Sequence, residues 1–398
     1  MGEAWPSALH VIDARSPGAG LVAVRIAAAL AAAADAPQPI LFLGSDRDRK
    51  AARATAAETG APDGTVLDGP CPPLGDPTLA VRPLRRAIAN LEATRGGFAR
   101  LVGWGVAASL SLALAMPGRA RATVSTGGAV ADRRLVRLAR RGTGRFACLS
   151  EAASRSFVAA SPAFGPIAEL PVPPAAWRPV GERSEIRAAW EVDDATIVVG
   201  VLADDPRRCD LKQALDALGF AAAAGVRSLL VVSPRAARLA PAREWTRTFR
   251  SFSIPALGGG ESRFWIADGR LDRPWSVVAG LDAAFIAGDG IATAGAAAFA
   301  DRVGFLDRLL APRLAAFDPG HRPRAVPDSP LPGLCAAAAG VPVLAEEGGD
   351  RVAPARAVLA LAEDRAALAS PVAAARSDLD ARHGPESLER WREFLATG

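Results

Sequence analysis

The fold class follows from residues 196–232, TIVVGVLADDPRRCDLKQALDALGFAAAAGVRSLLVV. The stretch opens with an apolar run at Thr196–Leu202 that is typical of a buried strand, continues with a helical pattern over Leu211–Ala224, and closes with a second apolar run at Ser228–Val232. A strand, a helix and a strand in this order predict a parallel pair joined by a crossover helix. The stretch therefore predicts an α/β domain with a parallel sheet.

The same alternation of strands and helices runs along most of the chain. Further strands are expected at Leu9–Asp13, Ile40–Gly44, Leu101–Gly103, Arg121–Ser125, Phe146–Leu149, Phe264–Ile266, Ala283–Ala287 and Val341–Ala345. Further helices are expected at Leu21–Ala34, Arg82–Thr94, Val106–Met116, Asp132–Arg140, after the N-cap Ser150, at Leu331–Ala339, and over Val352–Leu395 with breaks at Pro371 and Gly384-Pro385. Ser45–Pro77 and Ile291–Pro330 are expected to be irregular.

The length and one proline-rich segment predict two domains. A chain of 398 residues exceeds the roughly 250–300 that one hydrophobic core usually serves. The segment LPVPPAAWRPVGER at Leu170–Arg183 favours an extended connector. We therefore expect a Rossmann-like domain at 1–170, a linker at 171–186, and a second Rossmann-like, doubly wound domain with a helical tail at 187–398, with the chemistry in the cleft between them.

Composition excludes several classes of protein. No apolar run approaches the ~18 residues of a membrane-spanning helix, and the N-terminus lacks the pattern of a signal peptide. The four cysteines, Cys71, Cys148, Cys209 and Cys335, form no CxxC pair, which favours reduced thiols over a structural metal site. The net charge of +5 is spread along the chain, which argues against nucleic-acid binding. The sequence predicts a cytoplasmic protein, with peripheral contact with an acidic membrane surface as an alternative.

Gly18, Gly20 and Ala23 have a GxGxxA spacing at the start of the first expected helix. Glycines there let backbone N–H groups approach an anion at the positive end of the helix dipole. Three interpretations stay open: a glycine loop that lines the cleft, an NAD site with Asp46 on the ribose, or a plain turn.

The histidines indicate no hydrolase or deaminase. His10, His321 and His383 are the only ones in the chain, and none stands in a GxSxG, HExxH or HxE…PCxxC context. His10 lies within an expected buried strand, where a hydrogen-bonded core residue is the usual role.

Eight segments together carry a resemblance to a known family. In the second half they are the strand IVVGVL with the basic stretch DDPRR, the helix DLKQALDAL, the strand SLLVV, then GLDAAFIAG and LPGLCAAAAGVPVLAEEGG. In the first half they are SPGAGLVAVRIAAAL, FACLSEAASRSF and the connector PPAAWRP. In this order they resemble the retaining glycosyltransferases of the GT-B fold, family 4 type.

The resemblance implies that the second domain holds a nucleotide-sugar donor without a metal ion or other cofactor. It also implies transfer of a hexose to a glycan or lipid acceptor with retention of configuration. The family places a basic residue after the Gly of the first strand of this domain, a Lys early in the next helix, and two acidic residues further on. Here these positions hold Val201, Cys209, Pro327 and Cys335.

Neighbouring residues offer replacements for the missing charges. The resemblance then implies Arg207, Arg208 and Lys212 at the diphosphate, Asp328 with Ser329 at the sugar hydroxyls, and Gly18 with Gly20 near the phosphates or the acceptor. A solvated loop and an exposed helix face are the alternative for the cations. Two further functions stay open: a non-catalytic GT-B-like binding or scaffold protein in polysaccharide assembly, and an NAD-dependent oxidoreductase based on Gly18, Gly20 and Ala23.

Overall fold

The computed structural model describes residues 4–13, 19–70, 81–126, 144–160, 167–202, 211–234, 265–286, 330–344 and 352–396. The chain divides into two compact units. The first comprises Met1–Val180, Ser329–Ala338 and Ala375–Gly398, and the second comprises Gly181–Asp328 and Ala339–Ala374. The last residues of the chain, expected from the sequence in the second domain, thus pack with the first unit.

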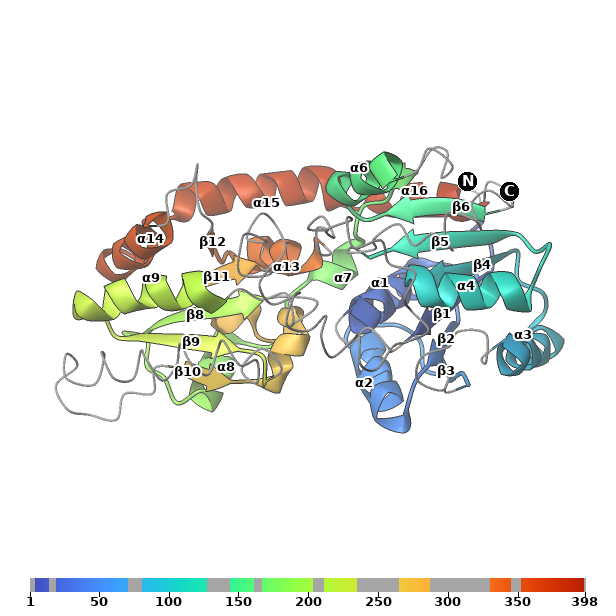
Figure 1. Ribbon diagram of the computed structural model, residues 1–398, viewed down its shortest axis with the longest axis horizontal. Helices are drawn as coiled ribbons and strands as arrows, with labels where there is room; N and C mark the ends of the chain where they lie inside the picture. Colours follow the sequence, from blue (N-terminus) through green and yellow to red (C-terminus); the bar gives the residue numbers. More distant parts are fainter. Residues whose placement is uncertain are drawn as a thin grey trace, which may run out of the picture. The chain divides into compact units, whose positions relative to one another are not determined.

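The first unit is built on a parallel seven-stranded sheet (Figure 1). Its strands are β1 (Ala8–Asp13), β2 (Ile40–Leu43), β3 (Val66–Asp68), β4 (Arg100–Trp104), β5 (Arg121–Ser125), β6 (Gly144–Cys148) and β7 (Ala168–Glu169). Their order in the sheet is β3-β2-β1-β4-β5-β6-β7. The helices α1 (Ala19–Ala33), α2 (Asp46–Ala57), α3 (Val81–Arg95), α4 (Gly105–Ala115), α6 (Glu151–Ala160), α7 (Pro174–Trp177) and α16 (Ser387–Ala396) complete the unit.

Side chains that alternate along β1 and β4 divide the core of this unit between two faces of the sheet. Leu9, Leu41 and Leu101 pack with residues of α3 and α4. On the other face Trp104 stacks on Trp391 of α16, with ring centroids 5.8 Å apart. Both faces are therefore covered, which explains why the central strands β1, β2 and β4 are mostly apolar and fully buried.

The second unit is built on a parallel five-stranded sheet with the order β10-β9-β8-β11-β12. Its strands are β8 (Ile197–Leu202), β9 (Ser228–Val232), β10 (Trp265–Ala267), β11 (Ala283–Ile286) and β12 (Val343–Leu344). One face packs against α9 (Leu211–Ala223) and α14 (Ala353–Glu363), which lie side by side in Figure 1. The unit also contains α8 (Arg183–Ala189) and the short 3-10 helices η4 (Gly269–Asp272), η5 (Pro274–Ser276) and η6 (Val278–Gly280).

The α/β class and the two parallel sheets are confirmed, and so is the N-cap Ser150, whose hydroxyl accepts a hydrogen bond from the Ala153 N–H. The prediction that Ser45–Pro77 is irregular was wrong, because this range contains α2 and β3. Ser45 begins α2 with a capping box that Asp48 completes. The expected helix at Asp132–Arg140 lies outside the described residues.

The structure refines two proline-based predictions. The helical tail is interrupted as predicted, but the break lies between the end of α14 at Glu363 and the start of α15 (Ala369–His383). Pro371 is the third residue of α15, where its missing N–H has no helical acceptor to lose. The expected connector 171–186 is not extended throughout, since Pro174 begins the short helix α7. The predicted break at Gly384-Pro385 is confirmed between α15 and α16.

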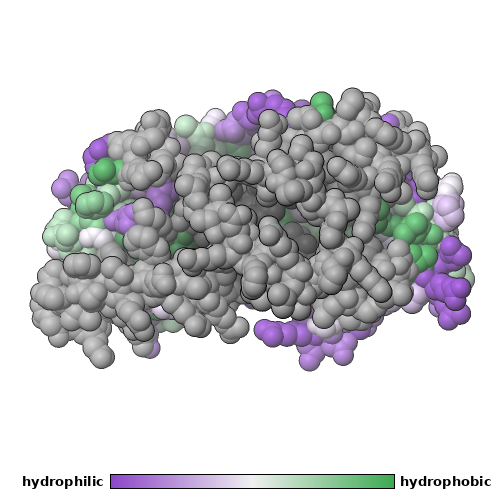
Figure 2. Space-filling model, in the orientation of Figure 1, coloured by the Kyte–Doolittle hydropathy of each residue, from purple (hydrophilic) through white to green (hydrophobic). Residues whose placement is uncertain are grey.

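Two helices with mostly exposed or half-buried side chains lie at the surface. α2 carries the run DRDRK, and α15 buries only Leu379. Figure 2 shows hydrophilic residues gathered where these helices lie. No described helix is long and apolar enough to cross a membrane.

Candidate functional site

Ligands of parallel sheets bind beyond the carboxyl ends of the strands, where the strand order reverses. In the second unit this point lies between β8 and β11. β8 ends at Leu202 and α9 begins at Leu211, so the segment 203–210 joins the carboxyl end of the strand to the amino end of the helix. The first N–H groups of a helix have no helical acceptor and attract anions. This edge is therefore the candidate ligand site of the second unit.

The equivalent point of the first unit lies between β1 and β4. β1 ends at the buried Asp13, and α1 begins at Ala19. Gly20 is buried in the first turn of α1. Gly20 is the second residue of this helix, Gly18 lies outside the described residues, and the glycine loop stays a prediction.

Most of the predicted donor-binding residues are not among the residues that the structure describes. Arg207, Arg208, Asp328 and Ser329 lie outside the described residues. Lys212 is the second residue of α9, and the structure describes its backbone but not its side chain. The backbone places Lys212 in the first turn of the helix, at the candidate edge.

His10 is a satisfied core residue. It is completely buried, its Nε2 lies 3.0 Å from Gln38 Oε1, and its Nδ1 accepts a hydrogen bond from the Trp104 indole N–H at 3.1 Å. Because the indole only donates, Nδ1 carries no proton and Nε2–H donates to Gln38. Burial lowers the pKa of His10 to about 4, against a smaller opposing effect of the Gln38 hydrogen bond. A neutral imidazole held on both sides has a structural role.

We expect the stability of the first unit to fall when the pH drops from 6.5 to 5. The pKa of His10 is about 4 in the folded chain and 6.5 in the unfolded chain. Between pH 6.5 and 5 the unfolded chain therefore binds a proton at His10 that the folded chain does not bind. The loss from this one group is about 1.5 kcal/mol. Urea unfolding at both pH values should show a smaller acid loss for His10→Asn, whose side chain does not titrate. Equal losses in the two proteins would contradict this assignment.

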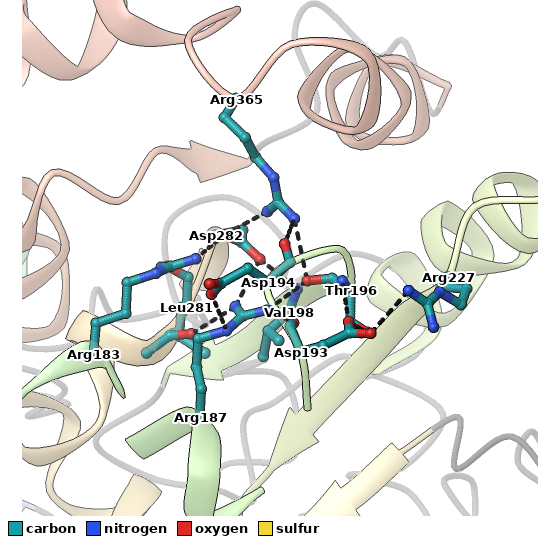
Figure 3. A network of polar contacts seen from close by, with 11 residues as sticks. Arg183, Arg187, Asp193, Asp194, Thr196, Val198, Arg227, Leu281, Asp282 and Arg365 are labelled. Atoms are coloured by element: carbon teal, nitrogen blue, oxygen red, sulfur yellow. Dashed lines mark hydrogen bonds and ion pairs between the residues drawn. The ribbon is translucent and has the colours of Figure 1, made fainter. Parts of the chain in front are cut away.

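A buried carboxylate, Asp282, joins several elements at the amino edge of the second sheet (Figure 3). It directly precedes β11, and its side chain is 5% exposed. The groups that reach it are the Arg183 Nη2 at 2.6 Å, the Arg187 Nη1 at 3.1 Å, the Arg365 Nη1 at 2.6 Å and the Val198 N–H at 2.7 Å. Arg187 also donates to the carbonyls of Gly280, Asp193 and Thr196.

The charge of Asp282 is fixed by these partners. Burial raises its pKa, but the hydrogen bonds from the Val198 N–H, Arg183 and Arg365 and the charge of Arg183 outweigh burial and hold the pKa below its usual value. The carboxylate is therefore ionised at neutral pH. Because this network lies at the edge opposite to the candidate ligand site, its role is to stabilise the sheet.

A buried arginine in the first unit fixes the start of the linker. Arg25 of α1 is completely buried, and its Nε and Nη2 donate to the carbonyl oxygens of Ala176 and Arg178 at 2.7 and 2.8 Å. Its Nη1 pairs with Glu58 at 3.2 Å. The helix that follows the glycine loop thus also anchors the chain as far as Arg178.

Comparison with known proteins finds similarity in three-dimensional structure but not in sequence families. No protein-family model and no curated protein matches the chain. Several solved structures match it over nearly the whole length, and three of them are described below. HepE of Anabaena, in complex with UDP and glucose, is 14% identical over 98% of this chain and 99% of its own, with a TM-score of 0.58. The sucrose-phosphate synthase of Thermosynechococcus elongatus is 12% identical over 98% and 100%, also with a TM-score of 0.58.

The third is the UDP-GlcNAc 2-epimerase of Neisseria meningitidis bound to UDP-GlcNAc, 10% identical over 98% and 99%, with a TM-score of 0.52. The chain has the GT-B fold. A synthase and an epimerase share this GT-B architecture, so the fold leaves the reaction open.

Val201 is the residue that the sequence resemblance matched to a basic position of the family 4 type. Val201 is 4% exposed and belongs to the core cluster with Leu211 and Ala214 of α9. Gly200 faces the other side, where an added Cβ would lie 2.5 Å from Leu281 Cδ1. Position 201 therefore points into an apolar core.

The two described cysteines are core residues of this GT-B chain. Cys335, which the sequence resemblance matched to the family's second acidic residue, is completely buried in α13 (Leu331–Ala339). Burial and the charge of Glu169 raise the pKa of Cys148 to about 12. Neither thiol is placed to act as a nucleophile. Cys71, Cys209 and Pro327 lie outside the described residues.

No metal centre is formed by the described part of the chain. There, no group of three or more His, Cys, Asp and Glu side chains is arranged to hold a metal ion.

Proposed function

We propose that this chain is a nucleotide-sugar-dependent hexosyltransferase whose donor binds at the carboxyl edge of the second sheet. The observation that carries the proposal is the reversal of strand order between β8 and β11, at which the chain presents the amino end of α9 and the segment with Arg207 and Arg208. The GT-B fold supports it, since HepE of that fold was crystallised with UDP and glucose.

The proposed reaction breaks the bond between the anomeric carbon and the diphosphate. The acceptor oxygen of a glycan or lipid forms the new bond on the same face of the sugar, so configuration is retained. Arg207, Arg208 and Lys212 neutralise the charge that develops on the departing diphosphate. Asp328 and Ser329 hold sugar hydroxyls, and Gly18 and Gly20 lie near the phosphates or the acceptor.

Replacing Arg208 with Ala should weaken the binding of a nucleoside diphosphate. Loss of one hydrogen bond to a charged group costs about 1.5–3 kcal/mol, which is roughly a 10- to 150-fold rise in Kd. Isothermal titration calorimetry with UDP, GDP and ADP measures this directly on the full chain.

Arg227→Ala is the matched control for this experiment. Arg227 belongs to the same unit but lies directly before β9, at the amino edge, where it pairs with the exposed Asp193 at 2.9 Å. The control removes the same charge and should leave Kd unchanged. Wild-type chain that binds none of the three nucleotides at millimolar concentration would rule out a donor site.

A specific observation favours a second candidate, a GT-B-like protein that binds or assembles without catalysis. The buried Val201 and Cys335 stand where the family 4 type has charged groups. Turnover of any nucleotide sugar, in a panel with extracted glycolipids or glycans, decides against this candidate. The NAD-dependent oxidoreductase has no support beyond the glycine spacing, and a cofactor-fluorescence titration tests it.

A further inference from the structure

Gln213 has a polar side chain that the folded chain leaves unsatisfied. It is the third residue of α9 and is 8% exposed. Within the described part of the chain, neither its Nε2 nor its Oε1 has a hydrogen-bond partner. Its neighbours Leu211 and Ala214 belong to the hydrophobic core. Buried amides of folded proteins are almost always hydrogen-bonded, so this one calls for an explanation.

The position of Gln213 in the first turn of α9 predicts that its carboxamide reaches toward the candidate ligand edge. Long side chains of α-helices point back toward the amino end and cover the turn that precedes their own Cα. From the first turn of α9 this direction leads to the end of the helix where the segment 203–210 arrives from β8. α9 has 13 residues, so its amino end also offers N–H groups without helical acceptors. Two independent features thus meet at one place.

The chemistry of the carboxamide selects the kind of group that it binds. The amide has both donor and acceptor atoms, whereas phosphate oxygens only accept. A phosphate would satisfy the NH2 group and leave Oε1 facing negative charge. A hydroxyl group both donates and accepts, so it can satisfy either atom of the amide. In a nucleotide sugar, the hydroxyls of the ribose and of the hexose are the groups of this type next to the diphosphate.

We propose that Gln213 is a specificity-determining residue, which hydrogen-bonds a sugar hydroxyl next to the diphosphate of a nucleoside diphosphate sugar. This inference rests on the proposed function and adds a residue that the family resemblance does not name. The ribose and the hexose offer the same chemistry, and the ligands of the test separate them.

Gln213→Met tests the proposal, because methionine keeps the length of the side chain and removes its hydrogen-bonding groups. Calorimetry is run with whichever of UDP, GDP and ADP the wild-type chain binds, with its glucose conjugate, and with pyrophosphate. We expect Kd for the glucose conjugate to rise roughly 3- to 10-fold and Kd for pyrophosphate to stay unchanged. An equal rise for the nucleoside diphosphate assigns the ribose, and no rise assigns the hexose.

Ala223→Met is the control, since Ala223 is exposed at the other end of α9. Unchanged affinity of Gln213→Met for both sugar-bearing ligands, in a wild-type chain that binds them, overturns this inference alone. A wild-type chain that binds no nucleotide overturns the proposed function as well.

A second measurement needs no ligand. If the amide is unpartnered in the folded chain, Gln213→Met should melt at the wild-type temperature or above, because it removes a buried group without hydrogen bonds. A clearly lower melting temperature would show that the amide has partners within the chain, and the inference would fail.

Discussion

Asp282→Asn is expected to destabilise the second unit by about 3–5 kcal/mol, the usual cost of breaking a buried ion pair on one side. The substitution keeps the shape of the side chain and removes the negative charge. Arg187, which is 3% exposed, then keeps as its nearest carboxylate only Asp194, 3.6 Å away and itself 96% exposed. The charge on Arg187 is left buried with little compensation, so the loss exceeds that of a surface pair.

Hydrogen exchange followed by mass spectrometry measures this effect within one unit. Peptides from β8 and β11 should lose protection in Asp282→Asn, while peptides from β1 serve as the internal reference. Asp193→Asn is the matched control, because Asp193 belongs to the same network but pairs with Arg227 at the surface. Protection of β8 in Asp282→Asn equal to that in the control would contradict a stabilising role for this carboxylate.

The strands were predictable from the sequence because the sheets are buried on both faces. Ser228–Val232 was predicted with the observed bounds, since it is a short, mostly apolar run that follows a Gly turn. Arg121–Ser125 was also predicted with the observed bounds, although only Ala122 and Val124 in it are apolar. α2 escaped prediction because it buries only Ala52, Thr55 and Ala56. A helix without a large apolar residue on its inner face gives no periodic signal, and its capping box was the one sign available.

The long-range polar contacts could not be predicted. Arg25 reaches carbonyl oxygens 151 and 153 positions away, and Arg187 reaches Asp282 across 95 positions. Lys and Arg together number 47 in this chain, so no sequence feature distinguishes the buried arginines from the exposed ones. Packing alone decides which of them lose their water and require partners.

The candidate site, too, was predictable from the sequence only in part. The resemblance placed cations in the segment after β8, and the strand order now gives a physical reason for a ligand at that edge. Gln213 was visible in LKQALDAL as a polar residue beside apolar ones, but its meaning depends on the burial of an amide without partners. Whether a polar side chain is satisfied is a property of the folded chain and cannot be read from residue types.

Trp391→Ala is expected to cost the first unit about 3–5 kcal/mol, the range for removing a large buried aromatic side chain. Trp391 of α16 is completely buried, stacks on Trp104, meets Phe394 edge-on at 6.3 Å, and donates its indole N–H to the Pro171 carbonyl at 2.7 Å. The substitution leaves a cavity beside β4 and removes the hydrogen bond to the Pro171 carbonyl at the start of the linker. Hydrogen exchange should rise in α16 and in the peptide that contains Pro171.

Two control variants test the assignment. Trp391→Phe, which keeps a ring, should lose less stability than Trp391→Ala. Arg390→Ala, at an exposed position, should stay within about 0.5 kcal/mol of the wild type. Protection of the first unit unchanged in Trp391→Ala would mean that α16 does not contribute to its core.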